Sequence, residues 1–194
     1  MSGTSATGGY LTPIDPQPTE DDLMDDAIQE TIVGTTGLDP TLVRQRWQHK
    51  QPTQPPPDVS WCAVGIMGRT AIDYPYLVYL PDTNSMEMQR HEKIEVLASF
   101  YGDFDSHYAG LFRDGLYIPE NLEYLNTFGI KLQQVGANTN VPELINSQWI
   151  GRTDIEFTLV RQLNRFYRVL NILSAKGFVH FTHGAEVLTP WKTP

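Results

Sequence analysis

The stretch IEFTLVRQLNRFYRVLNI, residues 155–172, decides the fold of this chain. Its alternate positions are apolar at first and basic further along: Ile155, Phe157, Leu159, Arg161, Leu163 and Arg165. Alternation with a period of two predicts a strand with one buried face. Strands are typically ~5–6 residues long, whereas this one would span roughly 60 Å at ~3.3 Å per residue. We therefore expect one end to reach another molecule, as in a building block of an assembly.

Length and composition are those of a domain with a hydrophobic core. The chain has 194 residues, which is enough for one such domain. Its single cysteine, Cys62, excludes an internal disulfide. No apolar run approaches the ~20 residues that span a membrane, and the first residues lack a signal-peptide pattern. We expect no contact with a membrane.

The net charge of −9 is unevenly distributed. Residues 1–40 contain acidic residues and no Lys or Arg, whereas residues 151–194 are mildly basic. This polarity can order head-to-tail contacts between identical subunits, although a solvated acidic helix without a partner explains it equally well. The overall acidity argues against general nucleic-acid binding. The residues that we expect at an interface between subunits are Tyr10, Asp21, Asp22, Asp25, Arg152, Arg161, Arg165 and Arg168.

The chain divides into three expected segments. Residues 1–18 are small, polar and rich in Pro and Gly, which predicts an extended N-terminal arm. Residues 19–175 form the expected domain, and residues 176–194 a C-terminal extension. The domain begins with a predicted helix that Thr19 caps and that ends at Gly34 and Gly37. Its expected apolar face consists of Leu23, Met24, Ala27, Ile28 and Ile32.

The remaining elements follow from periodicity and from turn residues. Strands are expected over residues 60–68, 74–80, 92–102, 130–136 and 155–172, a last short one at 178–181, and a loop at 81–91. Helices are expected from Asp103 or Asp105 to Gly115, with Phe104, Tyr108, Leu111 and Phe112 on the apolar face, and from Pro119 to Gly129. Residues 40–47 fit a helix or an extended segment, and residues 51–58 a polyproline connector. This order predicts an α+β fold with a mostly antiparallel sheet and helices packed on one face.

Residue patterns of catalysis are missing from the sequence. His180 and His183 form an H-x-x-H pair, but on a strand end they would point to opposite faces, so we expect no metal. Cys62 lies in an apolar run beside Trp61 and is expected to be a buried small hydrophobe. There is no G-x-S-x-G, P-loop or G-x-G-x-x-G motif. We expect no cofactor and no enzyme, and a small hydrolase or nucleotide-binding enzyme is the disfavoured alternative.

Several blocks of sequence resemble the neck terminator proteins of contractile-tailed bacteriophages (myoviruses) and prophages. The blocks are LVRQRWQ (42–48), WCAVGI (61–66), HEKIEVLASFYG (91–102), LFRDGLYIPENLEYL (111–125) and WIGRTDIEFTLVRQLNRFYRVLNI (149–172). No single block is diagnostic, but their shared order and spacing extend the resemblance over roughly residues 20–175.

The resemblance implies a structural virion protein with a tail-terminator-like fold. Such proteins form hexameric rings that cap the tail tube, end its polymerisation and present a surface to the head. The implied partners are further copies of the chain, the tail tube protein, the sheath protein and the head–tail connector (gateway) protein. Genomic DNA would pass through the lumen without specific binding. The implied location is the neck of the virion, and the host cytoplasm during assembly. A collar or other connector-ring component, or a baseplate-proximal ring, remains the alternative. The long strand is further expected to extend the sheet of a neighbouring subunit.

Overall fold

The computed structural model describes residues 10–14, 18, 20–50, 52–145 and 147–169. Most of the predicted arm and all of residues 176–194, with His180, His183 and the expected last strand, lie outside them. The chain forms two compact units. The larger unit contains residues 17–76 and 89–164, and the smaller one contains residues up to 16, 77–88 and those from 165 onward.

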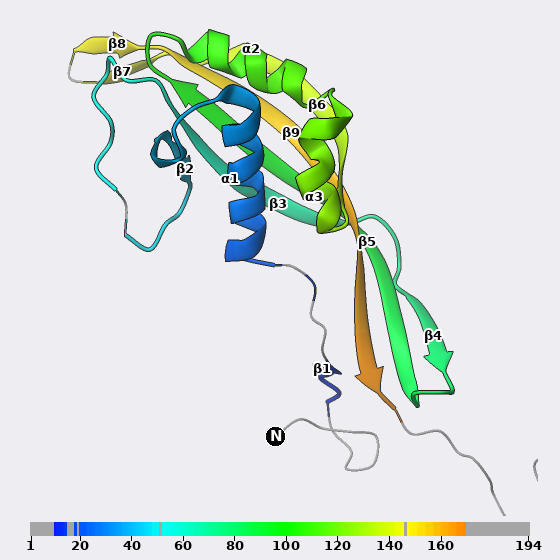
Figure 1. The fold of residues 1–194 in the computed structure, drawn as a ribbon. Helices are drawn as coiled ribbons and strands as arrows, with labels where there is room; N and C mark the ends of the chain where they lie inside the picture. Colours follow the sequence, from blue (N-terminus) through cyan, green and yellow to red (C-terminus); the bar gives the residue numbers. More distant parts are fainter. Residues whose placement is uncertain (1–9, 15–17, 19, 51, 146, 170–194) are drawn as a thin grey trace, which may run out of the picture. The chain divides into compact units, whose positions relative to one another are not determined.

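The fold is built on a mixed, mostly antiparallel sheet (Figure 1). The predicted α+β class is confirmed. In the described residues its seven strands are β1 (Pro13–Ile14), β2 (Val43–Gln45), β3 (Trp61–Ala71), β4 (Tyr76–Leu80), β5 (Ser85–Tyr101), β6 (Ile130–Asn140) and β9 (Arg152–Arg168). The order is β1-β9-β5-β3-β2, with β4 on β5 and β6 on β9. The β2–β3 pair is parallel, whereas β3–β5, β6–β9 and β1–β9 are antiparallel. Strands β7 (Glu143–Ile145) and β8 (Gln148–Ile150) form a separate antiparallel pair.

The long C-terminal strand is confirmed. It is β9, which begins three residues earlier than predicted and, within the described residues, extends to Arg168. Its buried side chains have the predicted parity, with Ile155, Leu159 and Leu163 at 0% exposed. In the larger unit β9 lies between β5 and β6. Because both of its edges are occupied in this way, β9 offers no free edge there, and the expectation that it extends a neighbour's sheet is wrong for that part of the strand.

The predicted loop at residues 81–91 is wrong from Ser85 onward, because β5 begins there. Residues 81–84 form a tight turn, in which Asn84 has a φ of 47°. Asn tolerates the left-handed conformation better than most residues, so the chain reverses within a few residues. The strand then pairs with β4, and this pairing was not predicted from the sequence.

Three α-helices lie on one side of the larger unit's sheet (Figure 1): α1 (Asp22–Thr36), α2 (Asp105–Gly115) and α3 (Glu123–Thr127). Two 3₁₀ turns, η1 (Pro40–Leu42) and η2 (Pro119–Leu122), precede β2 and α3. Helices on one face were predicted, and the connector at residues 52–58 is non-helical, as expected.

Helix α1 corrects two details of the prediction. It passes through Gly34 and ends at Gly37, whose φ of 72° allows its N–H to donate to the Val33 carbonyl. Leu23 was placed on the apolar face, but it is 62% exposed, whereas Met24 and Ala27 are fully buried. The predicted cap, Thr19, is outside the described residues, and Asp21 occupies the cap position.

The core of the larger unit lies between the helices and the sheet. Phe112 of α2 is fully buried, with its ring centroid 5.8 Å from that of Phe100 and 5.3 Å from that of Phe157. Phe104 and Leu111, which were predicted on the same face, are 62% and 40% exposed. Cys62 is fully buried in this core, and burial raises the pKa of its thiol. It therefore behaves as the small hydrophobe that the sequence predicted.

Candidate functional site

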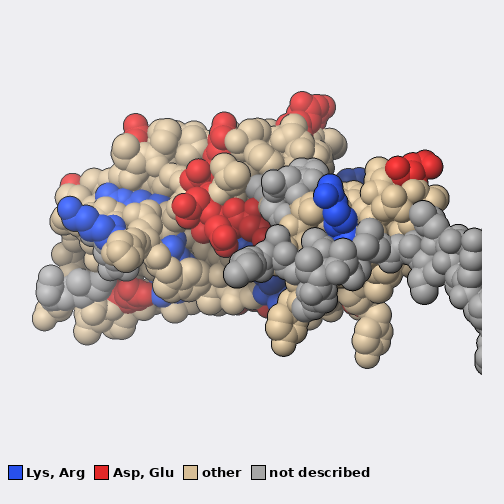
Figure 2. Space-filling model, turned by 90° about the horizontal axis from the view of Figure 1, so that it is seen from below, with Lys and Arg blue, Asp and Glu red and all other residues tan. Residues whose placement is uncertain are grey.

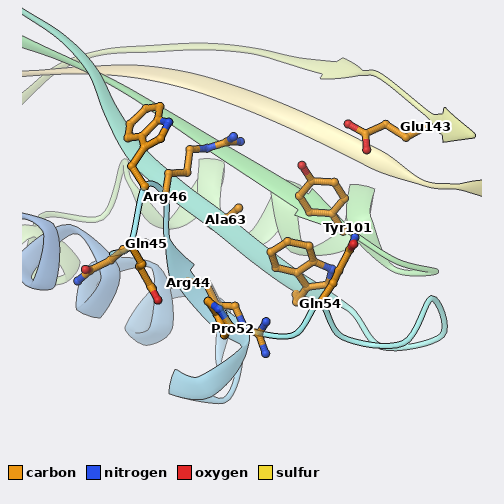
Figure 3. Close-up of a pocket in the computed structure, with 11 residues that line it drawn as sticks. Arg44, Gln45, Arg46, Pro52, Gln54, Ala63, Tyr101 and Glu143 are labelled. Atoms are coloured by element: carbon orange, nitrogen blue, oxygen red, sulfur yellow. The ribbon is translucent and has the colours of Figure 1, made fainter. Parts of the chain in front are cut away.

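A groove lies on the sheet face opposite the helices. We call it the β2 groove and define it by Arg44, Arg46, Trp47, Trp61, Tyr101 and Glu143, which are among the residues lining it. Its volume is about 310 Å³. Figure 3 shows its side chains rising from the strands, with Glu143 on the far side of the groove from Arg44.

Strand β2 places the arginines in this groove by simple alternation. Val43 points into the core and is 1% exposed, and Gln45 donates a 2.6 Å hydrogen bond to Asp26 of α1 on the same side. Arg44 and Arg46 have the other parity and therefore face away from the helices. The parallel pairing of β2 with β3 places Arg44 beside Ala63, and the backbone N–H of Arg46 donates a 2.7 Å hydrogen bond to the Val64 carbonyl.

Four side chains stack in sequence across the sheet. The guanidinium of Arg44 lies 5.8 Å from the ring centroid of Trp61. The Trp61 ring stacks on Tyr101 with a centroid distance of 4.4 Å and an interplanar angle of 9°. On the other side of Tyr101, the guanidinium of Arg152 lies 5.6 Å from its ring. Cation–π contacts of this kind add to the packing of the rings, so the stack fixes one wall of the groove.

Arg152 at the end of this stack is neutralised within the chain. Its Nε and Nη2 each donate a 2.8 Å hydrogen bond to Asp154, and its Nη1 donates to Glu143. These bonds, to Asp154 first and then to Glu143, raise the pKa of Arg152. Burial raises the pKa of Tyr101, against the opposing effect of Arg152. Both groups therefore keep one charge state at neutral pH.

The side chain of Arg46 extends across β3 to β5, where a hydrogen bond holds its guanidinium group. Its Nη2 donates a 2.5 Å hydrogen bond to Oγ of Ser99 on β5. Its Nε is buried without a hydrogen-bond partner in the described part of the chain. A Cβ on Gly65 would lie 2.9 Å from both the Arg46 Cβ and the Trp47 ring, so glycine is required beneath these two side chains.

Trp47 is the most exposed of the three aromatic residues that define the groove. It has a φ of 56°, a backbone conformation that costs a non-glycine residue of the order of 1–3 kcal/mol. Its side chain is nevertheless 65% exposed. A large exposed ring held by a strained backbone marks a surface for recognition better than a position for folding.

The charge of the groove is not balanced inside the described chain. Arg44 donates to the carbonyl oxygens of Thr41 (3.2 Å) and Thr53 (2.6 Å). Among the described residues, neither Arg44 nor Arg46 has a carboxylate oxygen within 4.0 Å. Glu143 on the opposite wall is bound by Arg152. The groove therefore presents two uncompensated cations beside an exposed indole.

The acidic residues predicted at an interface come together at the start of α1. Asp21 and Asp22 are exposed, whereas Asp25 is half-buried, and burial is the main cause that raises the pKa of Asp25. Figure 2 shows acidic side chains gathered in one patch on the side that the lower end of α1 faces in Figure 1. Tyr10, which belongs to the smaller unit, is 95% exposed.

Two of the predicted basic residues, Arg152 and Arg161, belong to the larger unit and lie on opposite faces of its sheet. Arg152 faces the groove side of the sheet, whereas Arg161 has the opposite parity and is 4% exposed. Both Nε and Nη2 of Arg161 lie 2.7 Å from Oε1 of Glu92, which is also 4% exposed. Arg165 is half-buried and Arg168 exposed, and both belong to the smaller unit. The interface role of these residues remains a prediction.

Sequence reasoning missed Arg44, Arg46 and Trp47 as members of a site. The run VRQRW, residues 43–47, holds two arginines with the spacing of one strand face, and this was a usable signal. It was hidden because the segment fitted a helix as well as a strand. The pairing of β2 with β3 resolves that choice.

Among the described residues, no group of three or more His, Cys, Asp or Glu side chains is placed to hold a metal ion. None of the described helices combines the length and the apolar character needed to cross a membrane.

Comparison with known proteins gives one positive result. A family model described as phage neck terminator protein matches residues 22–185, which include every element of the larger unit. No curated protein matches the chain.

Proposed function

The chain belongs to the phage neck terminator protein family, and on this premise we propose that it forms a ring, hexameric in the intact virion, that caps the tail tube. In this role it ends tail assembly and joins the tail to the head–tail connector, while DNA passes through an open lumen. The family makes it a structural protein of the phage neck. We further propose a contractile tail, in which the ring also contacts the sheath protein.

The match over residues 22–185 is the observation that carries this proposal. The structure supports it in a second way, because the acidic patch at the start of α1 and the cationic β2 groove are different surfaces. A contact between two different surfaces of identical subunits is heterologous, and it generates a ring where the rotation closes. A collar component or a baseplate-proximal ring is the competing position, and it predicts the same kind of contact at another height of the tail.

A phage that lacks this protein tests the proposal. We expect heads and tails that remain unjoined, and tail tubes without a defined end, in electron micrographs of lysates. Wild-type protein supplied from a plasmid should restore joined particles and is the control. Joined particles with tails of normal length in its absence would contradict the proposed function.

The N-terminal arm has its own test. The described part of the arm includes β1, which pairs with β9 through Pro13–Tyr167 and Ile14–Phe166 in the smaller unit. We propose that residues 1–18 contribute to ring or neck assembly. Deletion of residues 1–18 should weaken assembly, while the midpoint temperature of thermal unfolding of the larger unit stays unchanged. Unchanged assembly of the deleted chain would exclude this role of the arm.

A further inference from the structure

We propose that the β2 groove binds the acidic start of α1 from a second copy of the chain. In this contact Asp21 and Asp22 of one copy face Arg44 and Arg46 of the next, and Leu23 lies against Trp47. The assignment rests on the ring proposed above and names the surfaces that would join its subunits.

Charge complementarity is the first argument. Arg44 and Arg46 have no carboxylate within 4.0 Å among the described residues. Asp21 and Asp22 are exposed, and in the described part of the chain neither has a basic nitrogen within 4.0 Å. Residues 1–40 contain no Lys or Arg at all. Each surface therefore presents the charge that the other lacks.

Apolar complementarity is the second argument, and it is independent of charge. Leu23 is 62% exposed directly beside Asp21 and Asp22, and Trp47 is 65% exposed directly beside Arg46. Each surface therefore combines an exposed apolar side chain with neighbouring charges, which are negative beside Leu23 and positive beside Trp47. Trp and Arg are the residue types enriched among those that carry most of the binding energy in interfaces, and in this contact Leu23 would cover the exposed Trp47 ring.

The same copy does not fill its own groove with this segment. Met24 and Ala27 place the start of α1 on the helix side of the sheet, where both are fully buried. Trp61 and Arg44 lie on the opposite face, as their parity against the buried Cys62 and Val43 shows. The contact must therefore be intermolecular.

The observations favour a protein segment over DNA as the occupant. One face of the Trp61 ring is stacked on Tyr101 and Arg44 packs against the ring as well, while Tyr101 lies between Trp61 and Arg152. These two rings have little free surface on which bases can stack, so Trp47, at 65% exposed, is the one ring of the groove that is left, whereas single-strand binders stack successive bases on several aromatic side chains. The net charge of −9 also repels phosphates at long range.

The first experiment measures self-association of the full chain by sedimentation, with two exposed apolar positions compared. Leu23→Ser should weaken self-association about tenfold or more, as expected for an interface anchor. Phe104→Ser is the matched control, since Phe104 is also 62% exposed, and it should change association less than about twofold. Equal effects of the two substitutions would overturn the assignment. Neither residue is in the core, so both variants are expected to fold, which thermal unfolding checks.

Cross-linking then tests the pairing of the two surfaces. The only native cysteine, Cys62, is fully buried, so introduced cysteines are labelled selectively. A short bis-maleimide should join an Asp22→Cys copy to a Gln48→Cys copy, because Gln48 lines the groove. Glu123→Cys, on exposed α3, replaces Asp22→Cys as the control and should not react with the groove. Absence of the Asp22–Gln48 product overturns the proposal, whether the protein is then a ring or a monomer.

Charge reversal completes the test. The pair Arg44→Glu with Arg46→Glu should abolish self-association, and adding Asp21→Lys with Asp22→Lys in the same chain should restore it. Failure of this rescue in a folded protein would overturn the assignment. If the wild-type protein binds a labelled DNA duplex and the arginine substitutions abolish this binding, the groove is a DNA site instead. The phage that lacks the protein tests the neck function separately. A wrong assignment of the groove and a wrong proposed function are therefore revealed by different experiments.

Discussion

The ion pair between Arg161 and Glu92 provides the sharpest test of the fold. Their side chains are only 2% and 6% exposed, and both Nε and Nη2 of Arg161 lie 2.7 Å from one oxygen of Glu92. Replacing Arg161 with Met keeps most of the side-chain volume and removes the charge. Among the described residues, Glu92 would then remain buried with Arg90, 3.2 Å away, as its ion-pair partner.

Removal of one partner from a buried pair typically costs ~3–5 kcal/mol, because the remaining charge is uncompensated. Because Arg90 is still present, we expect Arg161→Met to lower the free energy of unfolding by about 3 kcal/mol. Glu92→Leu should cost a similar amount by leaving Arg161 without its nearest carboxylate. The double variant should recover most of the loss, since an apolar pair of similar volume is often as stable as the ion pair.

Guanidinium denaturation of the four proteins at pH 7, followed by tryptophan fluorescence, measures this cycle. A loss below about 1 kcal/mol for both single variants would refute the reasoning, since surface ion pairs have that size. Additive losses would also refute it, because they would show that the two side chains act independently. Unchanged stability with lost assembly would instead support the interface role predicted for Arg161 from the sequence.

Three further predictions follow from single features of the larger unit. Phe112→Ala should lower the free energy of unfolding by ~3–5 kcal/mol, because Phe112 fills the space between Phe100 and Phe157; thermal and denaturant unfolding measure it, and Phe104→Ala, at an exposed ring, is the control. Gly65→Ala should cost ~1–3 kcal/mol and shift the emission of Trp47, because the new methyl group would lie 2.9 Å from that ring; an unchanged spectrum and stability would contradict it. Hydrogen bonds from the ring and backbone of His91 lower the pKa of Asp73 from its ordinary value of 3.8, so its stabilising effect is present above pH 3.8 and is lost as the pH falls through the lowered value. Asp73→Asn removes this titration, so below pH 3.8 the stability of the variant should fall slightly less steeply with decreasing pH than that of the wild-type protein. The difference is small because Asp73 and His91 are exposed, and an unaltered pH dependence would argue against their interaction.

The larger elements were predictable because their patterns are strong. The alternation in residues 155–172 predicted β9 and its buried parity, since a one-residue shift would turn every apolar side chain to the other face. Gly37 and Gly129, which were both predicted as helix ends, have a positive φ, whereas Gly34, which was predicted together with Gly37, lies inside α1. In these segments local preference and burial favour the same structure.

Tertiary pairing decided the parts that were not predictable. The first residues of β5, Ser85 to Arg90, lack a clear alternation of apolar and polar side chains, and the strand there became evident only from its pairing with neighbouring strands such as β4. Leu23 fits the apolar face of α1 by composition, but the helix turns it outward. Strand β2 has three residues, too few for a period to be recognised, so the shared face of Arg44 and Arg46 appeared only with the structure.

A cryo-EM reconstruction of the neck of the intact virion, with this chain located in it, tests the central claim most directly. The account predicts a sixfold ring between the last ring of the tail tube and the head–tail connector, with an open lumen. In that ring the start of α1 of one subunit should lie in the β2 groove of the next. Density that places the chain outside the channel wall, or a virion without any copy of it, would contradict the claim.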